Sequence, residues 1–421
     1  MFRRFYVGRL ALAVWGGLVV VSCVQGGESS SEVNRLTPEE VAEGWLLLWD
    51  GQTLFGWRAE PEGAWQVADD LPQANLQANP SQSAKAAKPP GGQLARLIST
   101  SQWADFILRL DFRVDPGSQA SVVLRTDAQP VAEGEAKKSE YELKSGYELI
   151  LAEALAAWPV GSLKDRKKAE GRPLTSDWHS MQVRLEAGTI AVWLDGQQVL
   201  EYEDPKPIRR GHVVLQAQTG RVAFRNIKLR PLGLRRIFNG RDLTGWKQYP
   251  QTPTKCTVTP EGYLRVQGGR GQLESEDQYG DFILQLEVFV NGQGLNSGVF
   301  FRCIPGESMN GYECQIHNGF VDGDRNKPKD CGTGGIFRRQ NARRVVADDF
   351  QWFTLTIHVH GAHVATWVNG YQTADWTDTR PADPNPRKGR RLEPGTLQIQ
   401  GHDPTTDLMF RNIRIGKLPE R

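Results

Sequence analysis

Three polar side chains stand at alternate positions in the second half of this chain. Glu313, Gln315 and His317 are separated by single apolar residues, so in a strand they share one face while Ile316 faces the other way. A carboxylate and an imidazole are among the side chains that most often move protons in catalysis. The alternation predicts either a cleft lined by these groups or an ordinary solvated sheet face.

Arg302 and His402 can reach the same cleft from other segments. Arg302 ends a strand-like run and either orients a substrate or pairs with Glu313 as a surface ion pair. His402 follows the predicted end of a strand and precedes Asp403. For each histidine, a hydrogen-bonded structural role is the alternative to catalysis.

His358, His360 and His363 form a second polar cluster. His358 and His360 alternate on a predicted strand and can face the same side, but no carboxylate is placed with them. We therefore expect an exposed strand here and not a metal site. A divalent metal stays open as a cofactor, although no ligand spacing identifies one.

These candidates lie in the second of two related halves. Five segments recur in the same order: 48–57 as 237–246, 105–110 as 281–286, 146–148 as 311–313, 193–196 as 367–370, and 224–227 as 410–413. So long a period indicates a duplicated domain, because solenoid repeats are roughly 20–50 residues long. We expect one domain at 44–231 and another at 233–418, docked together because the connection between them is short.

Both halves have the pattern of short antiparallel strands. Residues 354–360 alternate, and 363–368 run into Asn369-Gly370, a strong hairpin signal. The pattern predicts an all-β fold of two-sheet sandwiches. Concave sheet faces of this kind often bind sugars through aromatic side chains.

Local signals add three smaller expectations. Residues 37–43 are the best short helix candidate, with Thr37 as the cap. Trp57 and Trp246 follow equivalent turns and are expected to be structural. Residues 79–92 have the composition of an unstructured surface insert.

The chain begins with the pattern of an export signal. Three arginines precede an uncharged run at 10–21, and a bilayer-spanning helix needs about 20 apolar residues. The run ends in small residues before Cys23, as in a bacterial lipobox, where the cysteine is lipidated; the alternative is an ordinary signal cleaved a few residues later. We expect a signal peptide with a lipobox at 1–23, a tether at 24–43, and a lipoprotein held at the membrane in the periplasm or at the cell surface.

The composition argues against a dedicated nucleic-acid binder, because a net charge of +2 on 421 residues leaves no basic surplus. The basic runs at 338–344 and 387–391 are expected to be solvated loops or partners of carboxylates. Cys303 and Cys314 are expected to be buried thiols, and a Cys314–Cys331 disulfide is the alternative.

The second half resembles a known bacterial family in five segments, namely 238–246, 296–302, 311–316, 332–336 and 410–415. They are similar, in order, to the 3-keto-disaccharide hydrolase family; the resemblance covers 233–418 and, more weakly, 44–231. It implies two tandem concanavalin-like jelly-roll sandwiches, exported by a Gram-negative-type bacterium. Members act on glycosides whose C3 hydroxyl has been oxidised to a ketone, by hydrolysis or by elimination followed by hydration.

That chemistry assigns roles to the candidates. A C3 ketone acidifies the C2 hydrogen, so a base can remove it and the C1 glycosidic oxygen can leave. We expect Glu313, His317 and His402 to be catalytic. Substrate binding is expected from the following residues: Asn296, Arg302, Tyr312, Gln315 and Asp403.

The first half is an internal control. It keeps Glu148 at the place of Glu313 but has Ile150 at the place of Gln315, and His402 has no histidine equivalent. We therefore expect the first domain to bind sugar or act as a scaffold, and the second to be the enzyme. The alternative is a non-catalytic cell-surface protein with two lectin-like domains, although a lectin duplicated for avidity would keep its binding groups in both copies.

Overall fold

The computed structural model describes residues 33–68, 71–75, 94–130, 141–152, 157–170 and 173–420. From Asn34 onward the chain forms one compact unit. The predicted signal with Cys23, residues 24–32 of the predicted tether and the insert at 79–92 lie outside the described residues. Within the described ranges, no helix has the length and apolar character needed to cross a bilayer.

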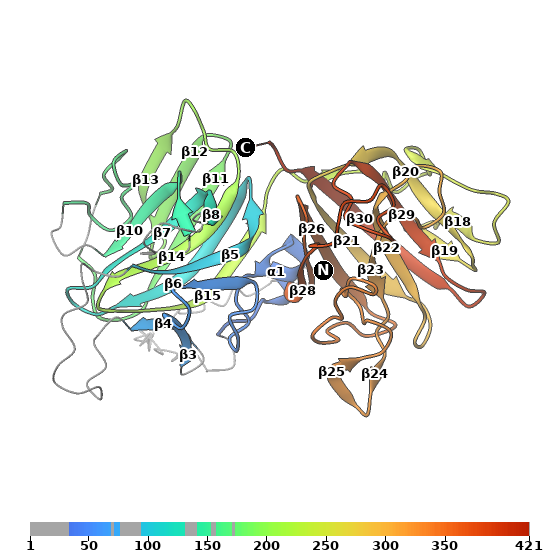
Figure 1. The fold of residues 1–421 in the computed structure, drawn as a ribbon, viewed down its shortest axis with the longest axis horizontal. Helices are drawn as coiled ribbons and strands as arrows, with labels where there is room; N and C mark the ends of the chain where they lie inside the picture. Colours follow the sequence, from blue (N-terminus) through green and yellow to red (C-terminus); the bar gives the residue numbers. More distant parts are fainter. Residues whose placement is uncertain are drawn as a thin grey trace, which may run out of the picture. The chain divides into compact units, whose positions relative to one another are not determined.

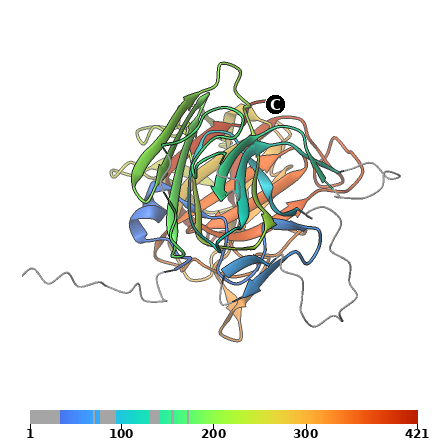
Figure 2. The ribbon, with the colours of Figure 1, turned by 90° about the vertical axis from the view of Figure 1, so that its left-hand side faces the viewer.

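The first half folds into two antiparallel sheets. One sheet has the order β13-β12-β11-β6-β15-β4-β3, with β1 also paired to β15, and the other has the order β10-β7-β14-β5-β2. Figures 1 and 2 show these blue-to-green strands in two layers. The bounds are β1 Leu46–Leu47, β2 Trp57–Glu60, β3 Trp65–Ala68, β4 Leu71–Asn75, β5 Ala95–Trp103, β6 Phe106–Val114, β7 Gln119–Thr126, β10 Tyr147–Ala152, β11 His179–Glu186, β12 Thr189–Leu194, β13 Gln197–Glu203, β14 Gly211–Thr219 and β15 Arg221–Pro231; a separate pair is β8 Ala128–Pro130 with β9 Tyr141–Leu143.

The second half repeats this strand order. Its larger sheet has the order β28-β27-β26-β21-β30-β19-β18, with β16 also paired to β30, and its smaller sheet has the order β23-β22-β29-β20-β17. The bounds are β16 Arg235–Arg236, β17 Trp246–Lys247, β18 Lys255–Val258, β19 Leu264–Gln267, β20 Gly271–Tyr279, β21 Phe282–Val290, β22 Ser297–Cys303, β23 Tyr312–Ile316, β26 Trp352–His360, β27 His363–Val368, β28 Tyr371–Thr377, β29 Gly395–Gly401 and β30 Asp407–Lys417; a separate pair is β24 Phe320–Val321 with β25 Asp324–Pro328. The protein is therefore all-β, with two tandem jelly-roll sandwiches, as the sequence predicts.

Alternating side chains build a core within each sandwich, and the core of the first is continuous with Ile283, Ala365, Trp367 and Leu418 of the second half. In β11, residues at every second position are buried and the others are partly or fully exposed, as a half-exposed strand requires. Trp57 and Trp246 are 7% and 6% exposed, and their indole nitrogens donate to the carbonyls of Leu48 and Ile237. Both tryptophans are structural, in agreement with the prediction.

The predicted helix and hairpins are present. The helix α1 spans Pro38–Glu43, and Thr37 caps it through a reciprocal capping box with Glu40. At the β27–β28 turn, Asn369 and Gly370 both have positive φ, which the favoured two-residue hairpin turn requires.

Polar contacts join the two sandwiches within the compact unit. Arg210 lies 2.7 Å from Asp281, and the indole of Trp367 donates to the Leu47 carbonyl at 3.1 Å. Arg343, from the first basic run, lies 2.5 Å from Asp50. These contacts link β27 and two loop residues of the second sandwich to several elements of the first.

One expectation for the second half is wrong, and one alternative is not realised. The four described cysteines are free and buried, so the Cys314–Cys331 disulfide is not formed, whereas the buried thiols of Cys303 and Cys314 are confirmed. His358 and His363 are not on an exposed strand but are 0% and 8% exposed. Their strands turn one face to the first sandwich, which the sequence of the second half alone does not reveal.

Candidate functional site

The smaller sheet of the second sandwich carries a cavity of about 760 Å³ on its outer face. In β23, Tyr312, Cys314 and Ile316 belong to the core, so Glu313 and Gln315 point outward. The cavity is lined by Asn296, Glu307, Ser308, Met309, Asn310, Glu313, Gln315, Asp330, Phe337, Arg387, Gln400 and His402. Four of the predicted site residues are thus brought together: Asn296, Glu313, Gln315 and His402.

Glu313 is a buried carboxylate with little compensation. It is 6% exposed, and within the described residues no hydrogen bond to its carboxylate is present. Gly298 lies beside it, where a Cβ would come within 2.6 Å of Oε1, and the nearest cation is Arg387, with Nη2 4.0 Å from Oε2. Burial raises the pKa of Glu313 to about 7. The positive charge of Arg387 opposes this shift, and the negative charge of Asp330 adds to it. Such a carboxyl can take up and release a proton near neutral pH.

Amide oxygens lie in the same wall without partners. The Gln315 amide nitrogen donates to Asn296 Oδ1 at 2.8 Å, and Asn296 donates to Asp330 at 2.5 Å. Gln315 Oε1, Gln400 Oε1 and Asn310 Oδ1 are buried and accept no hydrogen bond from the described residues. A buried acceptor without a donor is unfavourable, so a ligand rich in hydroxyl groups would satisfy this wall.

Glu274, which sequence reasoning missed, holds the loop that closes one side of the cavity. Its carboxylate is 2% exposed and accepts hydrogen bonds from Thr396, Gln398 and the Gly306 amide. Burial opposes ionisation, but these bonds and one from Tyr249 outweigh it and lower the pKa of Glu274. Gln398 continues the support by accepting from the Met309 amide at 2.7 Å.

A sequence signal for this support existed. Gln272 and Glu274 alternate on β20, and Gln398 and Gln400 alternate on β29, as Glu313 and Gln315 do on β23. These three strands belong to one sheet, so one polar face extends across it.

His402 and Asp403 form a pair at the rim. The His402 Nδ1 lies 2.8 Å from Asp403 Oδ2, while the carboxylate also accepts from the Thr405 hydroxyl. The Thr405 hydroxyl and then His402 lower the pKa of Asp403 to about 2. Asp403 does not line the cavity, so its contribution is to orient the imidazole and leave Nε2 for a ligand.

Arg302 and Tyr312 are not in the cavity. Arg302 has positive φ at a bulge in β22 and is 2% exposed, with its guanidinium 2.9 Å from Asp281 and bonded to backbone carbonyls. The alternative Arg302–Glu313 ion pair is not formed, because the Arg302 guanidinium pairs with Asp281. Tyr312 points inward and donates to Asp378 at 2.8 Å.

His317 also lies outside the cavity. The strand β23 ends at Ile316, so the alternation that places Glu313 and Gln315 together does not extend to it. Its Nδ1 accepts a hydrogen bond from the Gly319 amide at 3.1 Å. The predicted catalytic role of His317 therefore has no support from the geometry.

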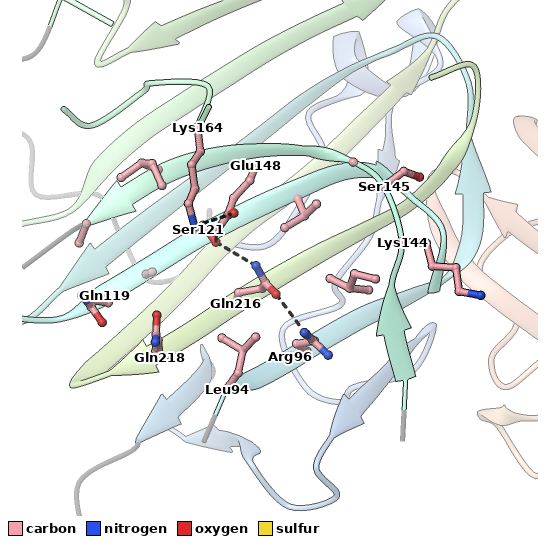
Figure 3. A pocket seen from close by; sticks show the side chains of 16 residues that line it. Leu94, Arg96, Gln119, Ser121, Lys144, Ser145, Glu148, Lys164, Gln216 and Gln218 are labelled. Atoms are coloured by element: carbon pink, nitrogen blue, oxygen red, sulfur yellow. Dashed lines mark hydrogen bonds and ion pairs between the residues drawn. The ribbon is translucent and has the colours of Figure 1, made fainter. Parts of the chain in front are cut away.

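The first sandwich has a cavity of about 570 Å³ at the equivalent place. Figure 3 shows Glu148 in it, bonded to the Ser121 hydroxyl at 2.9 Å and paired with Lys164 at 3.2 Å. Ser121 in turn accepts from Gln216. The carboxylate that corresponds to Glu313 is thus bound by its own neighbours.

Two further differences separate the faces. Ile98, Val123 and Val214 form a small buried apolar cluster in the first sandwich, and β-ladder register places Ile98 where the second has Glu274. Gln218 lines the first cavity at the place of His402. The first face therefore has an apolar side chain in place of the Glu274 carboxylate and an amide in place of the His402 imidazole.

Comparison with solved structures returns single-sandwich matches of low identity. Two candidate glycosyl hydrolases from Parabacteroides distasonis ATCC 8503 are 19% and 22% identical, with TM-scores of 0.37 and 0.35; the alignments cover 48% and 44% of this chain and 100% of each of those chains. A Bacillus licheniformis β-glucanase is 15% identical over 44% of this chain and 98% of its own, with a TM-score of 0.31. A comparison with curated proteins found no match.

A family comparison matches both halves. The family described as the 3-keto-alpha-glucoside-1,2-lyase-like domain matches residues 44–230 and again 233–416. The two matches correspond to the two sandwiches and make this a carbohydrate-acting protein. The chain belongs to the 3-keto-alpha-glucoside-1,2-lyase-like domain family, in two tandem copies.

Proposed function

We propose that the second sandwich cleaves 3-keto-glycosides by proton abstraction next to the C3 ketone. The observation that carries the proposal is Glu313, a buried carboxyl with a pKa raised to about 7 and no hydrogen bond from the described residues. It lines a cavity whose wall presents unpartnered amide oxygens. A sugar ring offers hydroxyl donors to that wall and an acidic C2 hydrogen to the carboxylate.

The proposed elimination proceeds in two steps, proton abstraction at C2 and departure of the C1 substituent. Glu313 takes the C2 proton, and the electron pair of the C2–H bond moves into an enolate with its charge on the C3 oxygen. Arg387, on the cavity wall, stabilises that charge. The enolate then restores the ketone and expels the C1 substituent, which leaves a C1=C2 double bond.

His402 serves the leaving group. Asp403 holds its Nδ1, so Nε2 can pass a proton to the departing glycosidic oxygen. Addition of water across the C1=C2 bond gives the free 3-keto sugar, so elimination followed by hydration equals hydrolysis overall. Arg302 and Tyr312 support the sheet from within and take no part in proton transfer.

The test is to incubate the protein with a 3-keto-glycoside in deuterated water. The proposal expects cleavage, and deuterium at C2 of substrate that is recovered before full conversion. Cleavage without C2 exchange would favour direct hydrolysis. If neither cleavage nor exchange occurs while glycans bind to both sandwiches, the protein is a carbohydrate-binding module.

We also propose that the protein is exported and anchored through Cys23, on the basis of the N-terminal sequence alone. A lipidated cysteine carries more than one acyl chain, which gives stable anchoring. Cys23→Ser should release the protein from membranes or block its processing. Unchanged membrane association of that variant would exclude lipidation.

A further inference from the structure

Three histidines converge where the larger sheet of the second sandwich contacts the first. One ring nitrogen from each of His358, His360 and His363 lies within 4.8 Å of those of the other two. His358 and His363 are almost fully buried, and His360 is half-buried between them. The rings also contact one another: the ring centroids are 5.3 Å apart for His358 and His360, which meet edge-on, and 4.7 Å apart for His360 and His363, which are tilted.

The hydrogen bonds of two of these rings define where their protons are. His358 Nε2 donates to the Gln102 carbonyl at 2.7 Å, and His363 Nε2 lies 2.6 Å from Asp375 Oδ1. A carbonyl or an ionised carboxylate only accepts, so both Nε2 atoms carry hydrogen. In the neutral ring, Nδ1 then keeps its lone pair.

Those lone pairs have no donor. The Nδ1 atoms of His358, His360 and His363 are all buried and have no hydrogen-bond partner among the described residues. The lone pairs on Nδ1 of His358 and His363 are therefore buried acceptors without a donor, which is unfavourable unless a ligand takes them up.

We propose that His358, His360 and His363 bind one divalent transition-metal ion of the zinc class. Three imidazole ligands suit zinc, and also copper, nickel and cobalt, better than calcium or magnesium. Zinc-bound nitrogens lie about 2.0–2.1 Å from the ion and hence about 3.3 Å apart, so ring nitrogens that lie within 4.8 Å of one another need to approach by at most about 1.5 Å. Asp375 and the Gln102 carbonyl are the outer partners that orient such ligands.

The outer partners give the ion a structural role. Gln102 belongs to β5 of the first sandwich, and Thr100 of the same strand donates to Asp375 Oδ1 at 2.9 Å. His358 is therefore hydrogen-bonded directly to the first sandwich, through Gln102, and His363 is connected to it through Asp375 and Thr100. A bound ion would stabilise the contact between the two halves. This site is distinct from the cavity around Glu313, whose lining does not include the three histidines.

The experiment measures metal binding by the full mature chain after removal of metals with a chelator. Zn²⁺ is titrated alone by calorimetry, and Co²⁺ is titrated while the visible absorption bands of low-symmetry coordination are followed. We expect one ion per chain at micromolar or lower concentration, and a rise in Tm with Zn²⁺ that the chelator reverses. Binding only at millimolar Zn²⁺, or none, would overturn the proposal.

Three variants identify the ligands. His360→Ala removes the ring that makes no hydrogen bond to any described residue, and should abolish both binding and the Tm response. Asp375→Asn keeps the ligands and should weaken binding about 10–100-fold. His317→Asn, a histidine outside the cluster, should bind as the wild type does. If His360→Ala folds and binds Zn²⁺ unchanged, or if His360→Ala fails to fold and Asp375→Asn leaves the affinity unchanged, the site is wrong.

Discussion

The two cavities of this protein have the same framework and different chemistry. In the first, Glu148 is held by Ser121 and Lys164; in the second, Glu313 faces Gly298 and has no hydrogen bond from the described residues. Hydrogen bonds and ion pairs from the protein stabilise the ionised carboxylate, so it is a weaker base toward a ligand. The comparison teaches that two copies of one framework can come to differ through the loss of a carboxylate's partners as much as through the gain of new polar groups.

The framework itself is duplicated in detail. Arg125 bonds to backbone carbonyls and to Asp105 in the first copy, as Arg302 does with Asp281 in the second. Tyr147 donates to Asp204, as Tyr312 donates to Asp378. A residue that is retained in both copies with the same partners is structural, even where its side chain is of a type that can bind substrate or transfer protons.

The largest expected effect breaks this framework. Arg302→Ala removes one of the two arginines that pair with Asp281 and leaves buried backbone carbonyls without their donor, and should lower the free energy of unfolding by about 3–5 kcal/mol. Arg125→Ala should cost a similar amount, measured by chemical denaturation of both variants. A stable Arg302→Ala protein that no longer binds substrate would restore the substrate-binding role that the sequence suggests.

A second prediction separates the two carboxylates by stability. The folded pKa of Glu313, about 7, lies above its ordinary value of 4.5, so the folded state takes up a proton and loses stability as pH rises from 4.5 through 7. Glu313→Gln removes this cost and should stabilise the protein by on the order of 3 kcal/mol at pH 8, with little change at pH 4.

The matched change Glu148→Gln should give no gain at pH 8, because it breaks the contacts to Ser121 and Lys164. Thermal unfolding of the two variants at both pH values provides the measurement. Equal effects of the two changes would remove the proposed difference between the cavities.

A smaller effect should follow from copying one residue between the halves. Gly298→Ser places a hydroxyl beside Glu313 as Ser121 stands beside Glu148. The new donor favours the ionised carboxylate, so the acid limb of the kcat/KM profile should move to lower pH and kcat should fall by about tenfold. An unshifted pH profile in an active variant would show that Glu313 is not the group that titrates.

Much of the fold follows from the sequence because β-structure repeats locally. Alternation, the Asn369-Gly370 turn and the ordered repeats are signals of a few residues, and they predict both sandwiches. Glu313 and Gln315 follow from the same alternation. The prediction fails at His317, where the strand has ended, since periodicity cannot show where a strand stops.

The remaining misses depend on contacts between distant segments. Arg302 looks like a substrate ligand until the carbonyls around it are known. Glu274 stands beside the site only because β20 and β29 are neighbours. His358 and His363 are covered by the first sandwich, which no pattern within the second half can predict.

The most direct test of the account compares turnover of a 3-keto-glycoside by Glu313→Gln and Glu148→Gln. General acid–base catalysis contributes about 10²–10⁴-fold, so kcat of the first variant should fall by a factor in that range, while the second should retain nearly wild-type turnover. The opposite result, a silent Glu313→Gln and an inactive Glu148→Gln, would place catalysis in the first sandwich and contradict the account.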